Sequence, residues 1–129
     1  MALPMASLLI ITGSSSGDYY LLKGRSVVIG RDDGSPIQIV DEAVSRRHLR
    51  IRQDADHRYV AEDLDSANGT SINDERIDRE RSLTDGDILT LGSTEIMFSA
   101  IDFADGETAF QHYRRRGEGD KSTTIRRAT

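Results

Sequence analysis

Short runs of apolar residues alternate with turn-forming residues along most of the chain. Leu8–Thr12 and Ser26–Gly30 are almost continuously apolar, which is typical of buried strands. In Leu49–Arg52 apolar and basic residues alternate, which predicts a strand with one buried and one solvated face. Glycine, proline and aspartate cluster between the runs and mark turns. About ten short strands, with no helical pattern before residue 102, indicate an all-β sandwich.

The pattern changes after Phe103, and this change predicts a domain boundary. Residues 1–103 are expected to form the domain, and 104–129 a charged C-terminal tail. The tail from residue 117 onward has the composition of a segment that is disordered alone. A short helix is predicted at Glu107–Arg116, with these residues on one side: Ala109, Phe110 and Tyr113.

Composition excludes several kinds of site. The 129 residues include no cysteine, so neither a disulfide nor a thiolate metal site can form. The three histidines stand in unrelated contexts, which gives a histidine metal site no support, and no cofactor is expected. A net charge of −5 argues against nucleic acid as a partner. No apolar run is long enough to span a bilayer and the start has no basic region, so a cytoplasmic protein without a membrane partner is expected.

Two polar loops follow apolar strands and are expected to meet at one edge of the sandwich. Arg31 ends an apolar strand, the first loop, after a short strand, carries Ser45 and Arg46, and the second loop carries Asn68. These side chains are hydrogen-bond donors, and arginine offers a fixed fork that matches phosphate oxygens. No base or nucleophile pair accompanies them, so holding an anion is favoured over reacting with it. The favoured anion is a phosphate on another protein.

Each of these residues also has a purely structural interpretation. Arg31 can be a surface arginine after a turn glycine, and Ser45 a turn-capping hydroxyl. His48 is interpreted as structural, with its ring nitrogens joining two loops. Asn68-Gly69 is a strong hairpin signal because both residues tolerate positive φ. A hydrolase using Ser45 would need a placed base and an oxyanion hole, and neither is readable, so no enzyme is expected.

Taken together, these motifs resemble the forkhead-associated (FHA) domain over roughly residues 7–101. No single piece is specific, but their order and spacing form a strong signal. The matching stretches are Gly-Arg at 30–31, Ser-Arg-Arg-His at 45–48, Asp-Leu-Asp-Ser-Ala-Asn-Gly-Thr-Ser-Ile-Asn at 63–73, and Leu-Thr-Asp-Gly-Asp-Ile-Leu-Thr-Leu-Gly at 83–92.

The resemblance implies an eleven-stranded β-sandwich of two twisted sheets that binds phosphothreonine peptides and is not catalytic. Carried over by position, Arg31 holds the peptide backbone and the phosphate, and Ser45 and Arg46 contact the phosphate. Asn68 bonds the peptide main chain. Secondary contacts are expected from Arg47, Ala67 and Thr70, and architectural roles from Gly30, His48 and Gly69.

Three positions depart from the family pattern. Ala67 stands where a threonine or serine often contacts the phosphate, which implies one missing hydrogen bond. Ala43 stands where an arginine can select an acidic residue at the +3 position of the ligand, so an apolar +3 residue is equally compatible. Asp74 replaces a frequent glycine and is expected to affect only a turn.

The expected function is that of an adaptor in Ser/Thr kinase signalling. Its partners would be threonine-phosphorylated proteins, a Ser/Thr kinase among them, or its own tail phosphorylated at Thr123 or Thr124. The alternative is an FHA-fold interaction or structural module that does not read phosphate and is regulated by that tail.

Overall fold

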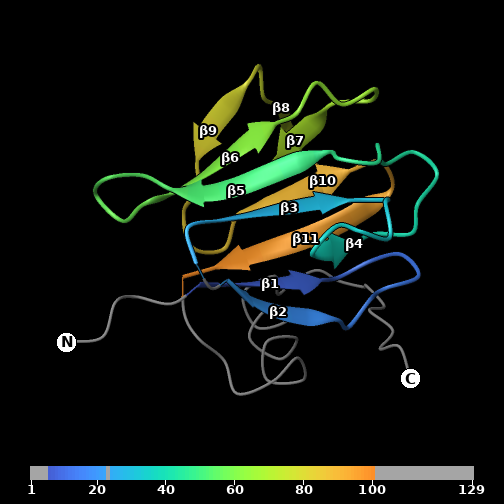
Figure 1. Cartoon of the computed structure of the whole chain (residues 1–129), viewed down its shortest axis with the longest axis horizontal. Helices are drawn as coiled ribbons and strands as arrows, with labels where there is room; N and C mark the ends of the chain where they lie inside the picture. Colours follow the sequence, from blue (N-terminus) through green and yellow to red (C-terminus); the bar gives the residue numbers. More distant parts are fainter. Residues whose placement is uncertain (1–5, 23, 101–129) are drawn as a thin grey trace.

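All eleven strands of the computed structural model, which describes residues 6–22 and 24–100, belong to two sheets (Figure 1). The six-stranded sheet has the order β2-β1-β11-β10-β7-β8, and the five-stranded sheet has the order β4-β3-β5-β6-β9. Every pairing is antiparallel except the parallel pair β3–β4. The all-β sandwich expected from the sequence is therefore confirmed.

Short strands, each bounded by turn residues, build both sheets. The six-stranded sheet contains β1 (Ala6–Ile10), β2 (Tyr19–Leu22), β7 (Thr70–Ile72), β8 (Glu75–Arg76), β10 (Ile88–Leu91) and β11 (Thr94–Ser99). The five-stranded sheet contains β3 (Ser26–Gly30), β4 (Ile37–Gln38), β5 (Leu49–Gln53), β6 (Tyr59–Asp63) and β9 (Glu80–Ser82).

An aliphatic core lies between the sheets. Alternate residues of the central strands point inward, as the period-2 pattern of Leu49 and Ile51 predicts. Phe98 is the largest fully buried side chain, and its ring meets that of Tyr59 at 5.6 Å between centroids. The core fixes the strands, so the loops at the strand ends start from well-defined positions.

The Asn68-Gly69 pair does not form the hairpin that its sequence predicts. β6 and β7 lie in different sheets, so the chain crosses the sandwich here instead of folding back on a neighbouring strand. Only Gly69 of the two has a positive φ, at 81°. The two-residue hairpin is instead Asn73-Asp74, which joins β7 to β8 with φ values of 53° and 70°.

The predicted tail falls outside the described residues, and so do the predicted short helix and Thr123 and Thr124. Among the described residues there is no helix long and apolar enough to cross a membrane.

Candidate functional site

Three loops meet at one end of the sandwich and are held together by main-chain hydrogen bonds. The β3–β4 loop meets the β4–β5 loop where the Arg31 N–H donates to the Ser45 carbonyl at 3.0 Å. The His48 N–H donates to the Ile29 carbonyl at 3.0 Å, and the Leu64 N–H donates to the His48 carbonyl at 2.9 Å. The β6–β7 loop thereby joins the other two. This network brings the loops of Arg31, Ser45 and Asn68 to one place.

Arg31 extends from the end of β3 and is exposed. Its Nε donates to the Val44 carbonyl at 2.9 Å, directly before Ser45. Guanidinium carries five N–H donors, so one orients the side chain while the terminal nitrogens remain for a ligand.

Ser45 lies in the β4–β5 loop with its hydroxyl facing the β6–β7 loop. Its Oγ accepts a hydrogen bond from the Ala67 N–H at 2.9 Å. Because the oxygen is used as an acceptor, the hydroxyl proton can be donated elsewhere. The side chain is partly exposed, so an anion at the surface can receive that proton.

Asn68 is exposed and reaches back across the site to the β4–β5 loop. Its Nδ2 donates to the Ala43 carbonyl at 2.9 Å. That bond fixes the plane of the amide, and the Oδ1 is an acceptor suited to the N–H of a bound peptide.

His48 is fully buried between the loops. Its Nδ1 accepts from the Ser45 N–H at 3.0 Å, so this nitrogen carries no proton, and Nε2–H then donates to the Gly69 carbonyl at 2.9 Å. Burial lowers the pKa of His48 from its ordinary value, against the opposing effects of the Gly69 bond, Asp63 and Asp41. The neutral ring is therefore the form that joins the two loops.

Two glycines allow the loops to approach so closely. A Cβ on Gly30 would collide with the Arg46 carbonyl, so β3 packs directly against the backbone of the β4–β5 loop. Gly69 has a positive φ, and a Cβ there would meet the Arg76 guanidinium at 2.5 Å. Arg76 therefore lies against Gly69, the residue after Asn68, and is a cation next to the site that the sequence motifs did not reveal.

The four remaining candidate residues occupy different depths. Arg46 and Arg47 are exposed, and neither side chain has an ion-pair partner among the described residues. Ala67 is exposed and contributes its N–H to Ser45. Thr70 is buried, and its hydroxyl donates to Asp63 at 2.8 Å, which places it beneath the loop instead of at its surface.

Two carboxylates that sequence reasoning missed support the loops from below. Asp41 accepts from the Ala43 N–H at 2.9 Å, the Ser93 N–H at 2.8 Å and the Thr94 hydroxyl at 2.9 Å. These bonds tie the β4–β5 loop to the β10–β11 turn. Burial acts to raise the pKa of Asp41, but the hydrogen bonds outweigh it and the pKa is lowered.

Asp63 is the second of these carboxylates, and it supports the β6–β7 loop through hydrogen bonds. It accepts from the Ser66 N–H at 3.0 Å, the Ser66 hydroxyl at 2.6 Å and the Thr70 hydroxyl. Burial acts to raise the pKa of Asp63, and the hydrogen bonds from Ser66 and Thr70 lower it overall. The available sequence signal was an aspartate followed three residues later by a serine, a common local cap.

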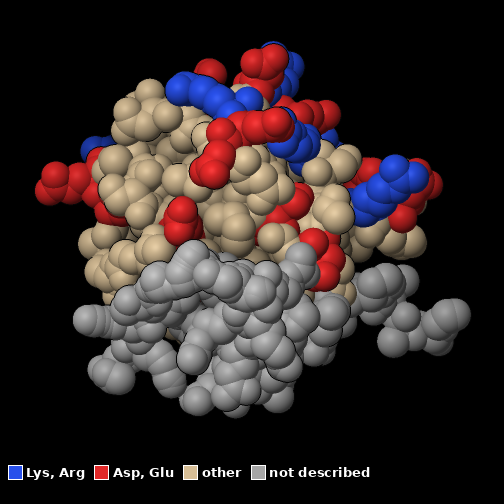
Figure 2. All heavy atoms as spheres, turned by 180° about the vertical axis from the view of Figure 1, so that it is seen from behind, with Lys and Arg blue, Asp and Glu red and all other residues tan. Residues whose placement is uncertain are grey.

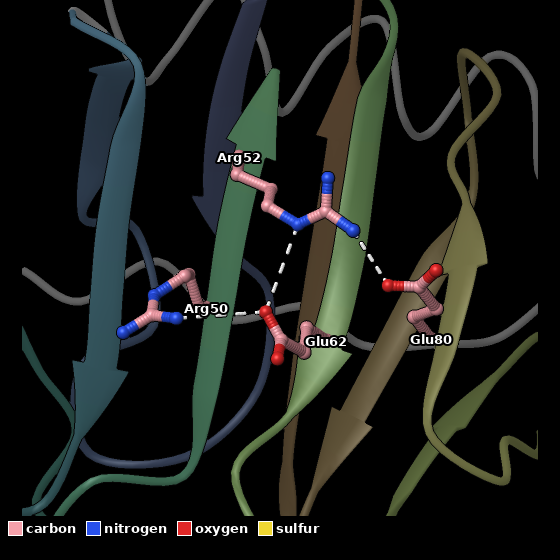
Figure 3. A network of polar contacts seen from close by, with 4 residues as sticks. All are labelled: Arg50, Arg52, Glu62 and Glu80. Carbon is pink, nitrogen blue, oxygen red and sulfur yellow. Dashed lines mark hydrogen bonds and ion pairs between the residues drawn. The ribbon is translucent and has the colours of Figure 1, made fainter. Parts of the chain in front are cut away.

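The charges at the loops differ from those on the outer face of the five-stranded sheet. There Arg50 and Arg52 both pair with Glu62, and Arg52 also pairs with Glu80 (Figure 3). A polar hollow of about 380 Å³ lies beside this network and is lined by Arg52 and Arg81. Arg81 pairs with Glu75. These arginines are compensated by carboxylates, so the unpaired cations at the loops suit an anion better.

No group of three or more His, Cys, Asp or Glu side chains in the described part of the chain is placed to hold a metal ion. The chemistry available at the loops is hydrogen bonding and charge.

Comparison with known proteins identifies the class. The FHA domain family model matches residues 27–92, and the chain belongs to this family. FhaA of Mycobacterium tuberculosis, an FHA domain-containing protein, is 43% identical over 82 residues, which cover 64% of this chain and 15% of FhaA. The oxoglutarate dehydrogenase inhibitor of Corynebacterium jeikeium is 34% identical over 98 residues, which cover 74% of this chain and 67% of that protein.

Solved structures agree. An FHA domain studied for phosphothreonine-dependent interactions superposes with a TM-score of 0.68 at 35% identity, covering 77% of this chain and 99% of that one. The FHA domain of an Arabidopsis thaliana protein gives a TM-score of 0.73 at 33% identity, covering 81% of this chain and 92% of that one. EmbR of Mycobacterium tuberculosis, solved in complex with a low-affinity phosphopeptide, superposes with a TM-score of 0.70 at 33% identity. The match covers 78% of this chain and 26% of the EmbR chain. The chain spans only 15% of FhaA and 27% of an FHA domain-containing protein of Arabidopsis thaliana.

Proposed function

We propose that this chain binds threonine-phosphorylated segments of other proteins in Ser/Thr kinase signalling, and that it does so without catalysis. The carrying observation is that Arg31, Ser45 and Asn68 converge while each keeps hydrogen-bonding capacity for a ligand. The relatives support this ligand class, since one is described by its phosphothreonine-dependent interactions and another was solved with a phosphopeptide.

A phosphothreonine brings about −1.5 to −2 charges and three acceptor oxygens. Arg31, Arg46 and the Ser45 hydroxyl donate to these oxygens, and Asn68 bonds the peptide main chain beside the phosphothreonine. Each charge-assisted hydrogen bond contributes about 1.5–3 kcal/mol net. Ordering an extended peptide offsets part of that gain, which leads to a dissociation constant of about 1 μM.

Ala67 supports one competing function. It offers no hydroxyl to the phosphate at a position beside Ser45, and an FHA-fold interaction module that does not read phosphate would tolerate this loss. The two functions differ in one property, because the competing module would bind phosphorylated and unphosphorylated peptides alike. The cytoplasmic location and the tail phosphosites Thr123 and Thr124 remain predictions. We also expect phosphothreonine to be preferred over phosphoserine, because the family resemblance implies a small apolar pocket that the threonine methyl fills.

The deciding experiment first selects a phosphothreonine peptide that binds the protein from a peptide library. Calorimetry then measures the affinity of the protein for this peptide, for its unphosphorylated form and for its phosphoserine form. Arg31→Ala and Ser45→Ala should each weaken binding of the phosphothreonine peptide by at least about tenfold, which corresponds to the loss of one charge-assisted bond. Arg50→Ala is the matched control, because it removes an arginine from the outer face of a sheet. Unchanged affinity in both site variants, with the fold intact by circular dichroism, would exclude the proposed site.

A further inference from the structure

A row of apolar side chains crosses the outer face of the six-stranded sheet. Leu9 of β1 is opposite Tyr19 of β2 on one side and Met97 of β11 on the other. Met97 is in turn opposite Ile88 of β10. Four adjacent strands therefore place apolar side chains in one continuous line.

These side chains point away from the core between the sheets. The neighbours Leu8, Ile96 and Phe98 belong to the central core, while Leu9, Met97 and Ile11 form a separate cluster. Successive side chains of a strand point to opposite faces, so this second cluster lies on the outward side.

The outward cluster is nonetheless buried. Leu9 is 1% exposed, Met97 2% and Ile11 3%, and Ser7 and Ser99 in the next row of the same face are each 1% exposed. Outward side chains of a two-layer sandwich ordinarily meet water. All strands of the described chain belong to the two sheets, and the five-stranded sheet lies on the opposite side of the core. The burial therefore requires a third layer beyond the described strands.

We propose that the chain's own residues 103–113 form this third layer. The described chain ends at Ala100, directly after β11 and three residues after Met97, so the segment that follows is joined to the strand that carries Met97. Ala109 and Phe110 lie four and three residues before Tyr113, a spacing that puts them on one face of a helix. This apolar helix face, together with Phe103 before it, is suited to cover the apolar row of Tyr19, Leu9, Met97 and Ile88.

Charge is compatible with the same occupant. Glu95 stands on the outward face two residues before Met97, and Arg114–Arg116 follow Tyr113 directly. The face opposite to that of Figure 1 is mostly uncharged where it is visible, with charged groups mainly at its top and sides and isolated acidic groups between (Figure 2). The domain would thus extend beyond residue 103, and Thr123 and Thr124 would be tethered to this face.

The absence of cysteine in the chain makes a direct distance test possible. A nitroxide attached through Gln111→Cys leaves Phe110 and Tyr113 in place. In the full-length protein it should broaden the amide signals of Leu9, Ile11 and Met97 strongly, and those of Arg50 and Glu62 on the opposite sheet weakly. Uniformly weak broadening would overturn the proposal.

A mixing experiment distinguishes coverage by residues 103–113 of the same chain from coverage by a second copy of the chain. Nitroxide-labelled protein without ¹⁵N is added to ¹⁵N-labelled protein without nitroxide, and no broadening of Leu9 or Met97 is expected. Broadening in the mixture would assign the face to a dimer and overturn the proposal.

A variant pair tests the anchors themselves. Phe110→Ser combined with Tyr113→Ser should abolish the broadening and lower the melting temperature by about 5 °C or more, since apolar surface becomes exposed. Gln111→Ser is the matched control, and Phe110→Leu should retain the contact. An unchanged melting temperature and unchanged broadening in the double variant would contradict the proposal.

Discussion

At the scale of single residues, the candidate site is prepared by hydrogen bonds that three of the proposed ligand-binding side chains make within the protein. Arg31 uses Nε on the Val44 carbonyl, Asn68 uses Nδ2 on the Ala43 carbonyl, and Ser45 uses its oxygen lone pair on the Ala67 N–H. These contacts orient each group before a ligand arrives. Less conformational entropy is then lost on binding.

Gly30→Ala tests the close approach of β3 to the β4–β5 loop. The new Cβ would collide with the Arg46 carbonyl, so either strand or loop must shift, at about 3 kcal/mol of folding free energy. Urea unfolding measures this loss. Gly34→Ala is the control, because only one side-chain atom lies near its Cβ, at 3.9 Å, and its stability should change by less than about 0.5 kcal/mol.

His48 predicts a dependence of stability on pH. Burial lowers its pKa in the folded state, whereas in the unfolded chain the pKa is about 6.5. The unfolded state therefore binds more protons between these two values, and stability falls as pH drops below about 6.5 toward the folded pKa. Unfolding free energies measured at steps from pH 7.5 to 5 should show this decline.

A variant isolates the contribution of that ring. His48→Gln cannot titrate, so its lower stability should lack the decline that belongs to the imidazole. Ring proton shifts that report a His48 pKa above 6.5 in the folded protein would contradict the assignment.

At the scale of elements, the site depends on loops that connect strands of different sheets. The β6–β7 loop crosses from one sheet to the other, so its position depends on both, and His48 and Asp63 fix it against the β4–β5 loop and β7. The crossing is also why Asn68-Gly69 is not a hairpin. A local turn signal cannot tell whether the next strand returns to the same sheet.

Asp41→Asn tests how the β4–β5 loop is supported. The asparagine keeps one acceptor oxygen and turns an NH₂ group toward the Ser93 N–H and the Thr94 hydroxyl, which removes charge-assisted bonds of about 1.5–3 kcal/mol. We expect lower stability and about tenfold weaker phosphopeptide binding, because the loop that carries Ser45 is loosened. Calorimetry and urea unfolding measure the two effects.

Glu42→Gln is the matched control, since it neutralises an exposed neighbouring carboxylate. A stability loss in Asp41→Asn with wild-type peptide affinity would mean that Asp41 supports the fold without positioning the loop.

At the scale of the whole molecule, a net charge of −5 coexists with a loop end that is locally basic. At physiological salt the Debye length is about 8 Å, so the nearby arginines dominate over distant carboxylates for a bound anion. The other arginines of the five-stranded sheet are paired across strands, as Arg50 and Arg52 are with Glu62. The distribution of partners, more than the total charge, decides where an anion binds.

A double-mutant cycle on Arg50 and Glu62 tests the structural assignment of that paired network. Their side chains are 35% and 27% exposed, so water screens the pair and a coupling energy of about 0.5 kcal/mol is expected. Phosphopeptide affinity should stay at the wild-type value in all three variants. A coupling above about 2 kcal/mol, or a loss of peptide binding, would show that this sheet face has a larger role.

The sequence by itself determined the sandwich and the residues around which the site is built. Alternation of apolar and polar positions is a local property, and motifs such as Ser-Arg-Arg-His carry their chemistry with them. Only the tertiary structure decided that Asn73-Asp74 is the hairpin, that Thr70 lies beneath the surface, and that Asp41 and Arg76 stand beside the site. These outcomes depend on which distant segments meet, and no local spacing encodes that contact.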